Sequence, residues 1–179
     1  MLRQLLVVFS MLATSTLAAA PVKASVVSIV DVVRVIDGDT VEIKSDGSLR
    51  RLRLQGVDAP EADQSWGTEA VQELKILIKG KRAFLRDSGL KDRYGRALGS
   101  LAVDDMDVGL ILLEKGLAWH FEPRQSTLPA DWNAAYKLAQ EEAKYESVGL
   151  WSSSSPVPPW VWRKHQYEIE RNKWSQTQA

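Results

Sequence analysis

Apolar and polar residues alternate along the first part of the chain with the period of two that is typical of β-strands. The alternation covers residues 40–44 and 49–57, and residues 25–36 before them are rich in β-branched side chains. Turn sequences at 37–39 and 46–47, each with an Asp-Gly pair, separate the three segments. This pattern predicts a meander of three antiparallel strands joined by short turns.

Further along the chain, apolar residues recur at every third or fourth position, as on the buried face of a helix. This spacing predicts helices over 68–78, 107–113 and 131–147, each with a glycine close to its end. Two further segments, 82–86 and 98–103, are interpreted as strands. We therefore expect an α+β fold with a mainly β core, a five-stranded Greek-key barrel of the OB type capped by about three helices.

Residues 1–24 differ from the rest of the chain and are typical of a signal peptide. Arg3 precedes an apolar run over 5–17, and Val22-Lys23-Ala24 supplies small or apolar residues before a cleavage site after Ala24. The run is shorter than the roughly 20 apolar residues of a membrane span, although an uncleaved signal-anchor is an alternative. We expect an exported protein, periplasmic or secreted, with no stable membrane insertion after cleavage.

The composition changes again towards the C-terminus. Four consecutive serines precede Pro156, a pattern that is typical of a linker. We therefore expect one OB-barrel domain at 25–155 and a Pro/Trp-rich tail at 156–179. Trp160 and Trp162 are expected to fold this tail back onto the barrel, and contact with the cell wall or with a partner is the alternative.

The composition also narrows the chemistry that the chain can support. None of the 179 residues is cysteine, which excludes disulfide scaffolds, cysteine-ligated zinc, iron–sulfur clusters and thiol nucleophiles. The two histidines, His120 and His165, are far apart in the sequence, so a multi-histidine metal site is excluded as well. Any metal must therefore be a hard cation with oxygen ligands, such as calcium or magnesium.

The balance of charge argues against a partner that is held by the overall field of the protein. The chain has 23 basic and 23 acidic residues, and cleavage after Ala24 removes Arg3 and Lys23, which leaves a net charge of −2. A chain with this charge does not attract polyanions as a whole. If the ligand is a nucleic acid, a local group of arginines must hold it.

Two acidic motifs carry candidate functional residues. In the first, Asp37 and Asp39 share one side of the chain if the backbone is extended, although Asp-Gly is equally typical of a plain hairpin turn. In the second, Asp58 ends a strand and Pro60 turns the chain, so that Glu61 can point to the same place as Asp58. The alternative for the second motif is a charged strand end without function.

A third motif, at 92–96, places two arginines around a tyrosine in a tight loop. Guanidinium groups match the geometry of phosphate, and a tyrosine ring can stack on a base. In isolation, a loop of this kind is most often only a solvated turn. Together, the three motifs contain what phosphodiester hydrolysis needs, namely ligands for a hard cation, guanidinium groups for the developing charge and a carboxylate that can accept a proton.

The combination and order of these motifs resemble the thermonuclease family, that is, staphylococcal nuclease and its relatives. The resemblance covers about residues 29–151, and it implies an OB barrel with three helices. The matching segments are VIDGDTV at 35–41, RLQGVDAPE at 53–61, WGTEA at 66–70, DRYGR at 92–96, GLAW at 116–119 and GLW at 149–151. The Pro-Pro-Trp-x-Trp-Arg segment at 158–163 is similar to the tail of some Gram-negative members.

The resemblance implies a metal site and a group that acts on water. Asp39 and Asp58 match the carboxylate ligands of a Ca²⁺ ion, and Ala59 matches a position that contributes its backbone carbonyl. Asp37 matches a supporting carboxylate near the metal. Glu61 matches the glutamate that activates or orients the attacking water.

The resemblance also implies a substrate site. Arg53 and Arg96 match the arginines that contact the scissile phosphate, and Arg93 and Tyr94 match substrate contacts. We therefore expect a monomeric, calcium-dependent nuclease that hydrolyses DNA and RNA with little sequence specificity, favours single strands and leaves 3′-phosphate products. The alternative is a non-catalytic OB module that binds an oligonucleotide or a cell-surface polymer.

Some positions depart from the family pattern. Ala59 stands where the family has a threonine, and Arg93 stands where it has a lysine. Phe121 lies in the region where a pair of tyrosines that contact phosphate and base is expected. The segment 62–66 is short and acidic, whereas the best-known member has a longer basic loop. These differences and the net charge of −2 predict weaker substrate binding than in that member.

Overall fold

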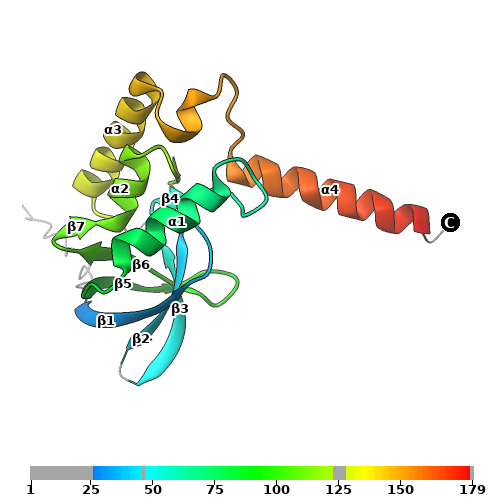
Figure 1. The fold of residues 1–179 in the computed structure, drawn as a ribbon. Helices are drawn as coiled ribbons and strands as arrows, with labels where there is room; N and C mark the ends of the chain where they lie inside the picture. The colour runs from blue at the N-terminus through cyan, green and yellow to red at the C-terminus, as the bar shows by residue number, and fades with distance from the viewer. Residues whose placement is uncertain (1–25, 46, 123–127, 178–179) are drawn as a thin grey trace, which may run out of the picture.

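A five-stranded barrel forms the centre of the structure, with helices packed beside it and one long C-terminal helix projecting away (Figure 1). The structure is a computed structural model, and it describes residues 26–45, 47–122 and 128–177. This architecture confirms the α+β fold with an OB-type barrel. Within the described residues, no helix is both long and apolar enough to cross a membrane. The expected signal peptide at 1–24 lies outside the described residues.

The first three strands form the antiparallel meander that the alternation predicts. They are β1 (Val26–Val35), β2 (Thr40–Ser45) and β3 (Ser48–Leu54). β2 pairs with both of its neighbours, and its first residue, Thr40, lies opposite Arg53 of β3. The turn between β1 and β2 and the end of β3 therefore lie at the same end of the barrel.

The barrel closes through two later strands. β5 (Ala83–Lys91) pairs with β1, and β6 (Ala97–Val103) pairs with β5, both in antiparallel fashion. β6 then returns beside β3 in parallel, with Leu98 opposite Arg53. The pairing of β3 with β6 closes the barrel, so this closure holds the residues at the junction in place.

Three very short strands complete the sheet structure. β7 (Met106–Asp107) pairs with β6 and extends the barrel sheet by one strand. β4 (Val57–Asp58) follows β3 directly and pairs with β8 (Trp119–His120). The second pair fixes Asp58 just beyond the end of β3.

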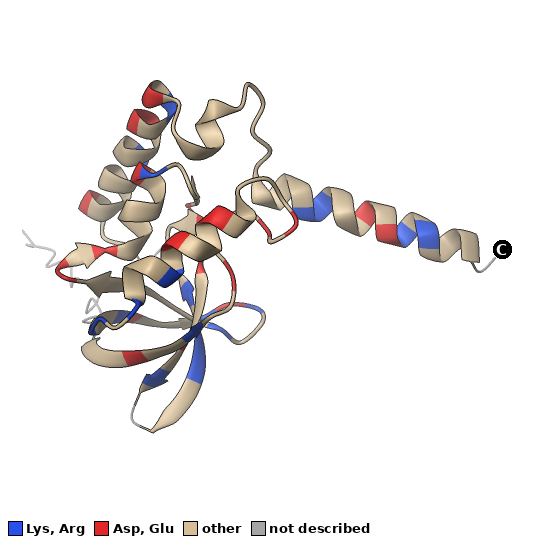
Figure 2. Ribbon diagram, viewed as in Figure 1, with Lys and Arg blue, Asp and Glu red and all other residues tan. Residues whose placement is uncertain are grey.

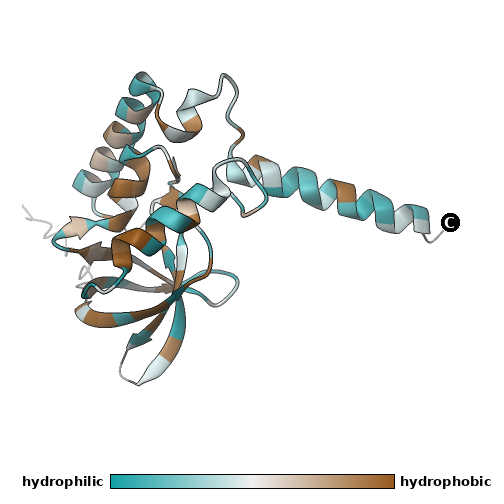
Figure 3. Ribbon diagram, in the orientation of Figure 1, coloured by the Kyte–Doolittle hydropathy of each residue, from teal (hydrophilic) through white to brown (hydrophobic). Residues whose placement is uncertain are grey.

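The core lies inside the barrel and extends under the helices. Alternate residues of β2 and β3 point inwards, and the helices α1 (Gly67–Ile78), α2 (Val108–Glu114) and α3 (Ala130–Glu146) add their apolar faces, as the hydropathy colouring in Figure 3 shows. The largest fully buried side chains are Tyr136, Ile43, Leu52, Leu54, Leu74, Leu85, Leu101, Leu112, Leu113, Val41, Val57 and Val108. A short 3₁₀ helix, η1 (Gly149–Ser152), follows α3.

The start of the C-terminal segment packs against the domain through Trp160 and Trp162, as expected, but the rest of it projects away. It forms a 19-residue helix, α4 (Pro159–Thr177), of which only the first part contacts the domain. Pro159 is buried, and the ring of Trp160 lies 5.7 Å from the rings of both Trp119 and Phe121. The rest of α4 is mostly polar in Figure 3, and Figure 2 shows basic, then acidic, then again basic positions along it.

Candidate active site

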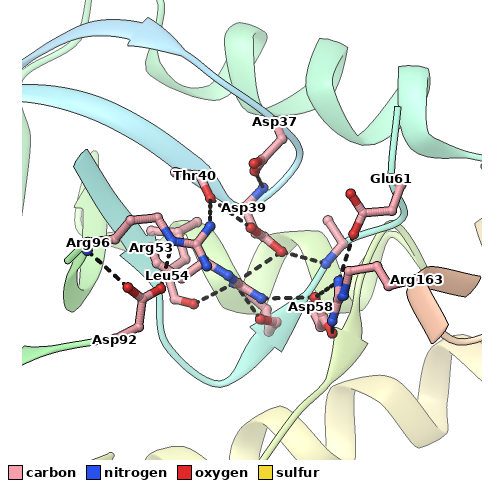
Figure 4. Close-up of polar contacts among 12 residues, drawn as sticks. Asp37, Asp39, Thr40, Arg53, Leu54, Asp58, Glu61, Asp92, Arg96 and Arg163 are labelled. Atoms are coloured by element: carbon pink, nitrogen blue, oxygen red, sulfur yellow. Dashed lines mark hydrogen bonds and ion pairs between the residues drawn. The ribbon is translucent and has the colours of Figure 1, made fainter. Parts of the chain in front are cut away.

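All nine residues that the sequence analysis selected line one cavity of about 370 Å³ at the open end of the barrel. They come from the β1–β2 turn, the end of β3, the segment after β4 and the β5–β6 loop. Four further residues complete the lining, namely Gly38, Arg51, Pro60 and Arg163. Carboxylates and guanidinium groups alternate around this cavity, as Figure 4 shows for most of its charged residues.

Asp39 and Asp58 lie side by side because two backbone segments approach each other closely. A Cβ atom on Gly38 would lie 2.6 Å from the Cβ of Ala59 and 2.9 Å from that of Ala70, so only glycine fits without a shift. This approach lets the N–H of Ala59 donate a 2.7 Å hydrogen bond to Oδ2 of Asp39. Both carboxylates are buried, with Asp39 at 5% and Asp58 at 2% exposure.

Arg53 lies between these two carboxylates. Its Nη1 is 3.0 Å from Oδ2 of Asp39, and its Nη2 donates to Oδ1 of Asp58 at 2.9 Å (Figure 4). Nη1 also donates to the backbone oxygens of Leu54 at 3.0 Å and Val57 at 2.7 Å. The Arg53 side chain is 14% exposed. Arg53 therefore holds the acidic group together in addition to facing the cavity.

The acidic group has more negative charge than Arg53 offsets. Burial raises the pKa of Asp39 to about 7; Arg53 lowers it, but the neighbouring carboxylates Asp37 and Asp58 raise it further. Asp37 also accepts a 3.1 Å hydrogen bond from the N–H of Asp39, which fixes the turn. A buried cluster of this kind favours an additional positive charge.

The donor types at this position fit a hard cation. Two carboxylates, Asp39 and Asp58, lie beside the backbone of Ala59, and calcium takes carboxylate and carbonyl oxygens. No group of three or more His, Cys, Asp or Glu side chains that could hold a metal ion occurs in the part of the chain that the structure describes. The protein side chains would thus supply only part of the coordination shell, and the remaining positions would be left for water and substrate oxygens.

The β5–β6 loop presents Arg96 on the opposite side of the cavity. Asp92 accepts hydrogen bonds from Nε of Arg96 at 2.7 Å and from the N–H groups of Tyr94 and Arg96, both at 2.9 Å. Partial burial raises the pKa of Asp92, but these hydrogen bonds outweigh it and lower the pKa below the usual value. Nη1 of Arg96 donates to Oγ1 of Thr40 at 3.2 Å. Asp92 and Thr40 thus fix the guanidinium plane.

Asp92 and Thr40 belong to the motifs quoted from the sequence, yet no role was assigned to either. The sequence contains a signal for the role of Asp92, because this residue precedes Arg96 by four positions in a tight loop and can therefore pair with it. The remaining loop residues are more exposed: Nη2 of Arg93 donates to the hydroxyl of Tyr94 at 2.6 Å, and the Tyr94 residue is 67% exposed.

Glu61 and Asp58 share a partner that the sequence analysis did not select. Arg163 of α4 donates from Nη1 to Oε1 of Glu61 at 2.7 Å and to Oδ1 of Asp58 at 3.2 Å, and from Nη2 to Oδ2 of Asp58 at 2.8 Å (Figure 4). The hydrogen bond to Asp58, and next to it the one to Glu61, raises the pKa of Arg163 in spite of its partial burial. Arg163 is the last residue of the Pro-Pro-Trp-x-Trp-Arg segment that resembles the tail of some family members, but no role was assigned to it.

A second cavity, of about 460 Å³, adjoins the first one. It shares several residues with the first cavity, among them Arg53, Asp58 and Arg96, and it adds the apolar side chains of Leu98 and Phe121. The region of Phe121, where no tyrosine pair is present, therefore still contributes an aromatic surface next to the charged cavity.

The barrel and its cavity define an OB-type protein with a site lined by both carboxylates and guanidinium groups. A family model described as "Staphylococcal nuclease homologue" matches residues 51–153, which is more than half of the chain. The chain therefore belongs to the family of staphylococcal nuclease homologues, as its motifs predict.

Relatives in bacteria and plants show the same similarity. The chain is 40% identical over 133 residues to a protein of Escherichia coli O157:H7 named "Uncharacterized endonuclease", which covers 74% of this chain and 82% of that protein. It is 32% identical over 143 residues to "Micrococcal nuclease" of Shigella flexneri, with 75% and 79% covered. It is 38% identical over 115 residues to "Staphylococcal-like nuclease CAN1" of Arabidopsis thaliana, with 64% of this chain but 33% of that protein covered.

Proposed function

We propose that this protein is a calcium-dependent nuclease that hydrolyses phosphodiester bonds of DNA and RNA with little sequence specificity. The observation that carries the proposal is the single cavity in which Asp39, Asp58 and Glu61 face Arg53 and Arg96. Membership of the family and the names of the relatives support the nuclease part of this proposal.

Each group in the cavity has a role that follows from its chemistry. A calcium ion at Asp39 and Asp58 would, when bound, neutralise charge on the phosphate and make a nearby water more acidic. Arg53 and Arg96 donate hydrogen bonds to the phosphate oxygens, where negative charge accumulates during hydrolysis. Glu61, at the edge of the cavity, accepts the proton of the attacking water, a step typically worth about 10²- to 10⁴-fold in rate.

The expected substrate range follows from the same groups. The charged side chains address the phosphate, which is the same in every nucleotide, and the exposed ring of Tyr94 can stack on any unpaired base. We therefore propose weak sequence preference, a preference for single strands and products with a 3′-phosphate. We also propose that the protein acts as a monomer, and the thirteen cavity residues of one chain support this proposal.

We further propose that the protein is exported and that residues 1–24 are cleaved from it. The mature protein would then consist of the domain at 25–155 and the segment at 156–179. The support is the basic residue, apolar run and cleavage sequence at the N-terminus. N-terminal sequencing of the exported protein should begin at Ser25 or within a few residues of it. An intact Met1 terminus in a membrane fraction would instead indicate a signal-anchor.

The decisive experiment is incubation of the purified mature protein with single-stranded DNA, with calcium or with a chelator. Cleavage should occur with calcium and stop with the chelator, and magnesium should support it less well because magnesium prefers a tighter octahedral shell. Binding of the DNA without any calcium-dependent cleavage would contradict the proposal and favour the non-catalytic OB module.

A further inference from the structure

Arg163 places a positive charge inside the acidic half of the candidate active site. Its two terminal nitrogens face both carboxylate oxygens of Asp58, at 3.2 and 2.8 Å, and one of them also reaches Glu61 at 2.7 Å (Figure 4). Asp58 is buried, whereas the Arg163 side chain is 47% exposed. The guanidinium thus enters the cavity from the solvent side and closes over a buried carboxylate.

The approach of Arg163 is supported by the docking of the first part of α4. Trp160 packs against the rings of Trp119 and Phe121, and Nε1 of Trp162 donates to Oδ1 of Asp63 at 3.3 Å. Just before the helix, Nε2 of Gln64 donates to the backbone oxygen of Val157 at 2.5 Å. These contacts hold the start of α4 in place, and they keep the backbone of Arg163 at a position from which its side chain contacts Asp58.

Arg163 uses the same oxygen atoms that a cation at this position would need. Oδ2 of Asp58 accepts from Arg163, and Oδ1 accepts from both Arg53 and Arg163. A dication bound to Asp58 would take over one of these oxygens and would lie within a few ångströms of a second positive charge. Both effects oppose simultaneous binding of the dication and Arg163 at Asp58.

We propose that Arg163 is an internal competitor of the divalent cation and sets the cation affinity of this site. In the cation-free protein, α4 supplies the positive charge that the buried carboxylates require, and cation binding requires Arg163 to withdraw from Asp58. This inference rests on the proposed function, because it takes Asp58 as a cation ligand. By reciprocity, a bound cation weakens the docking of Arg163 by the same factor by which Arg163 weakens cation binding.

Calcium binding to the full mature protein, measured by calorimetry in metal-free buffer, tests this inference. Arg163→Ala should bind calcium about tenfold more tightly than wild type, within the roughly 5- to 150-fold range of coupled sites. Arg163→Lys retains the charge but loses the two-pronged contact, so its affinity should fall between the two. Lys164→Ala is the matched control, because it removes the same charge from the next residue of α4, which does not line the cavity. Its affinity should stay within about twofold of wild type.

Thermal unfolding provides a readout that is independent of catalysis. In the presence of a chelator, Arg163→Ala should unfold at a lower temperature than Lys164→Ala, because Asp58 loses one of its two arginine partners and Glu61 loses its ion pair with Arg163. Saturating calcium should raise the unfolding temperature of Arg163→Ala by more than that of wild type. Circular dichroism should show that each variant is folded, since Arg53 still pairs with Asp58.

The possible outcomes separate this inference from the proposed function. Equal or weaker calcium binding in Arg163→Ala, with calcium-dependent cleavage intact in wild type, would overturn the competitor role and leave the nuclease proposal standing. An equal gain in Lys164→Ala would also overturn it, because the effect would then be one of net charge alone. Absence of calcium binding and of calcium-dependent cleavage in all variants would overturn the cation site itself.

Discussion

At the scale of single residues, Arg53 has two roles, because it faces the cavity and also pairs with the buried carboxylates of Asp39 and Asp58. Asp39, Asp58 and Glu61 were selected from two motifs, and the structure places them in one cavity. Arg53 was expected to address only a phosphate, whereas it also pairs with both buried aspartates and two backbone oxygens. Such contacts depend on how β3 meets the β1–β2 turn, and residue spacing alone does not contain this information.

Substitution of Glu61 separates chemistry from folding. Glu61→Gln keeps the size of the side chain but removes the basic carboxylate, so kcat should fall by about 100-fold or more. The residue lies at the edge of the cavity, and the variant should unfold within a few degrees of wild type by circular dichroism. Glu69→Gln, at an exposed position of α1, is the control and should keep full activity. A folded Glu61→Gln that cleaves DNA at nearly the wild-type rate would mean that another group activates water.

The two arginines should differ in what they contribute to stability. Arg53→Lys loses hydrogen bonds to buried partners, so it should reduce both kcat/KM and the free energy of unfolding, the latter by about 1–3 kcal/mol. Arg96→Lys loses an ion pair with Asp92 that is partly exposed, so its stability should change by less than about 1 kcal/mol while its activity still falls strongly. Urea unfolding alongside steady-state kinetics measures both effects. Similar stability for the two variants would contradict the structural role of Arg53.

At the scale of elements, strands and barrel helices were predicted well, and the C-terminal helix was missed. β2 and β3 show a clear period of two, and α1 has a buried stripe that the spacing of Ala70 and Leu74 marks. α4 has no such stripe, because most of its length projects from the domain and buries little. Its start, with Pro158 and Pro159, was interpreted as part of a Pro/Trp-rich tail without a helix, although proline is also common at the first position of a helix.

The β1–β2 turn should tolerate no side chain at position 38. Gly38→Ala would place a Cβ 2.6 Å from that of Ala59 and push the turn away from it, so Asp39 would lose its contact with the Ala59 backbone. We expect a loss of about 1–3 kcal/mol in stability, measured by urea unfolding, together with weaker calcium binding. Ala59→Gly removes the clashing atom, and the double variant should therefore recover part of the loss. Strictly additive effects of the two substitutions would contradict the proposed close approach.

At the scale of the whole molecule, burial of acidic groups links stability to pH. Burial raises the pKa of Asp39 to about 7, and it also raises the pKa of Asp107, which accepts hydrogen bonds from Tyr136 and from the N–H of Leu110. Between about pH 4 and pH 7, the folded protein therefore holds protons that the unfolded chain has released. Stability must then fall as the pH rises through this window.

Urea unfolding in the presence of a chelator, from about pH 5 to about pH 8, measures this dependence. Wild type should lose stability with rising pH, at most by about 1.4 kcal/mol per pH unit for each group. Asp39→Asn removes one titrating carboxylate, so its slope should be smaller. Identical slopes for Asp39→Asn and wild type would show that Asp39 does not titrate in this range.

The junction of β3 and β6 has a consequence for when the protein can act. Arg53 belongs to one strand of this pair, and Arg96 immediately precedes the other, which begins at Ala97. A chain whose barrel is still open therefore cannot bring both guanidinium groups to the same phosphate. If the proposed export is correct and the chain folds only after crossing the membrane, the polypeptide has no assembled active site while it is exposed to the cell's own nucleic acids. The requirement for complete folding would then prevent the protein from cleaving the cell's own nucleic acids before export.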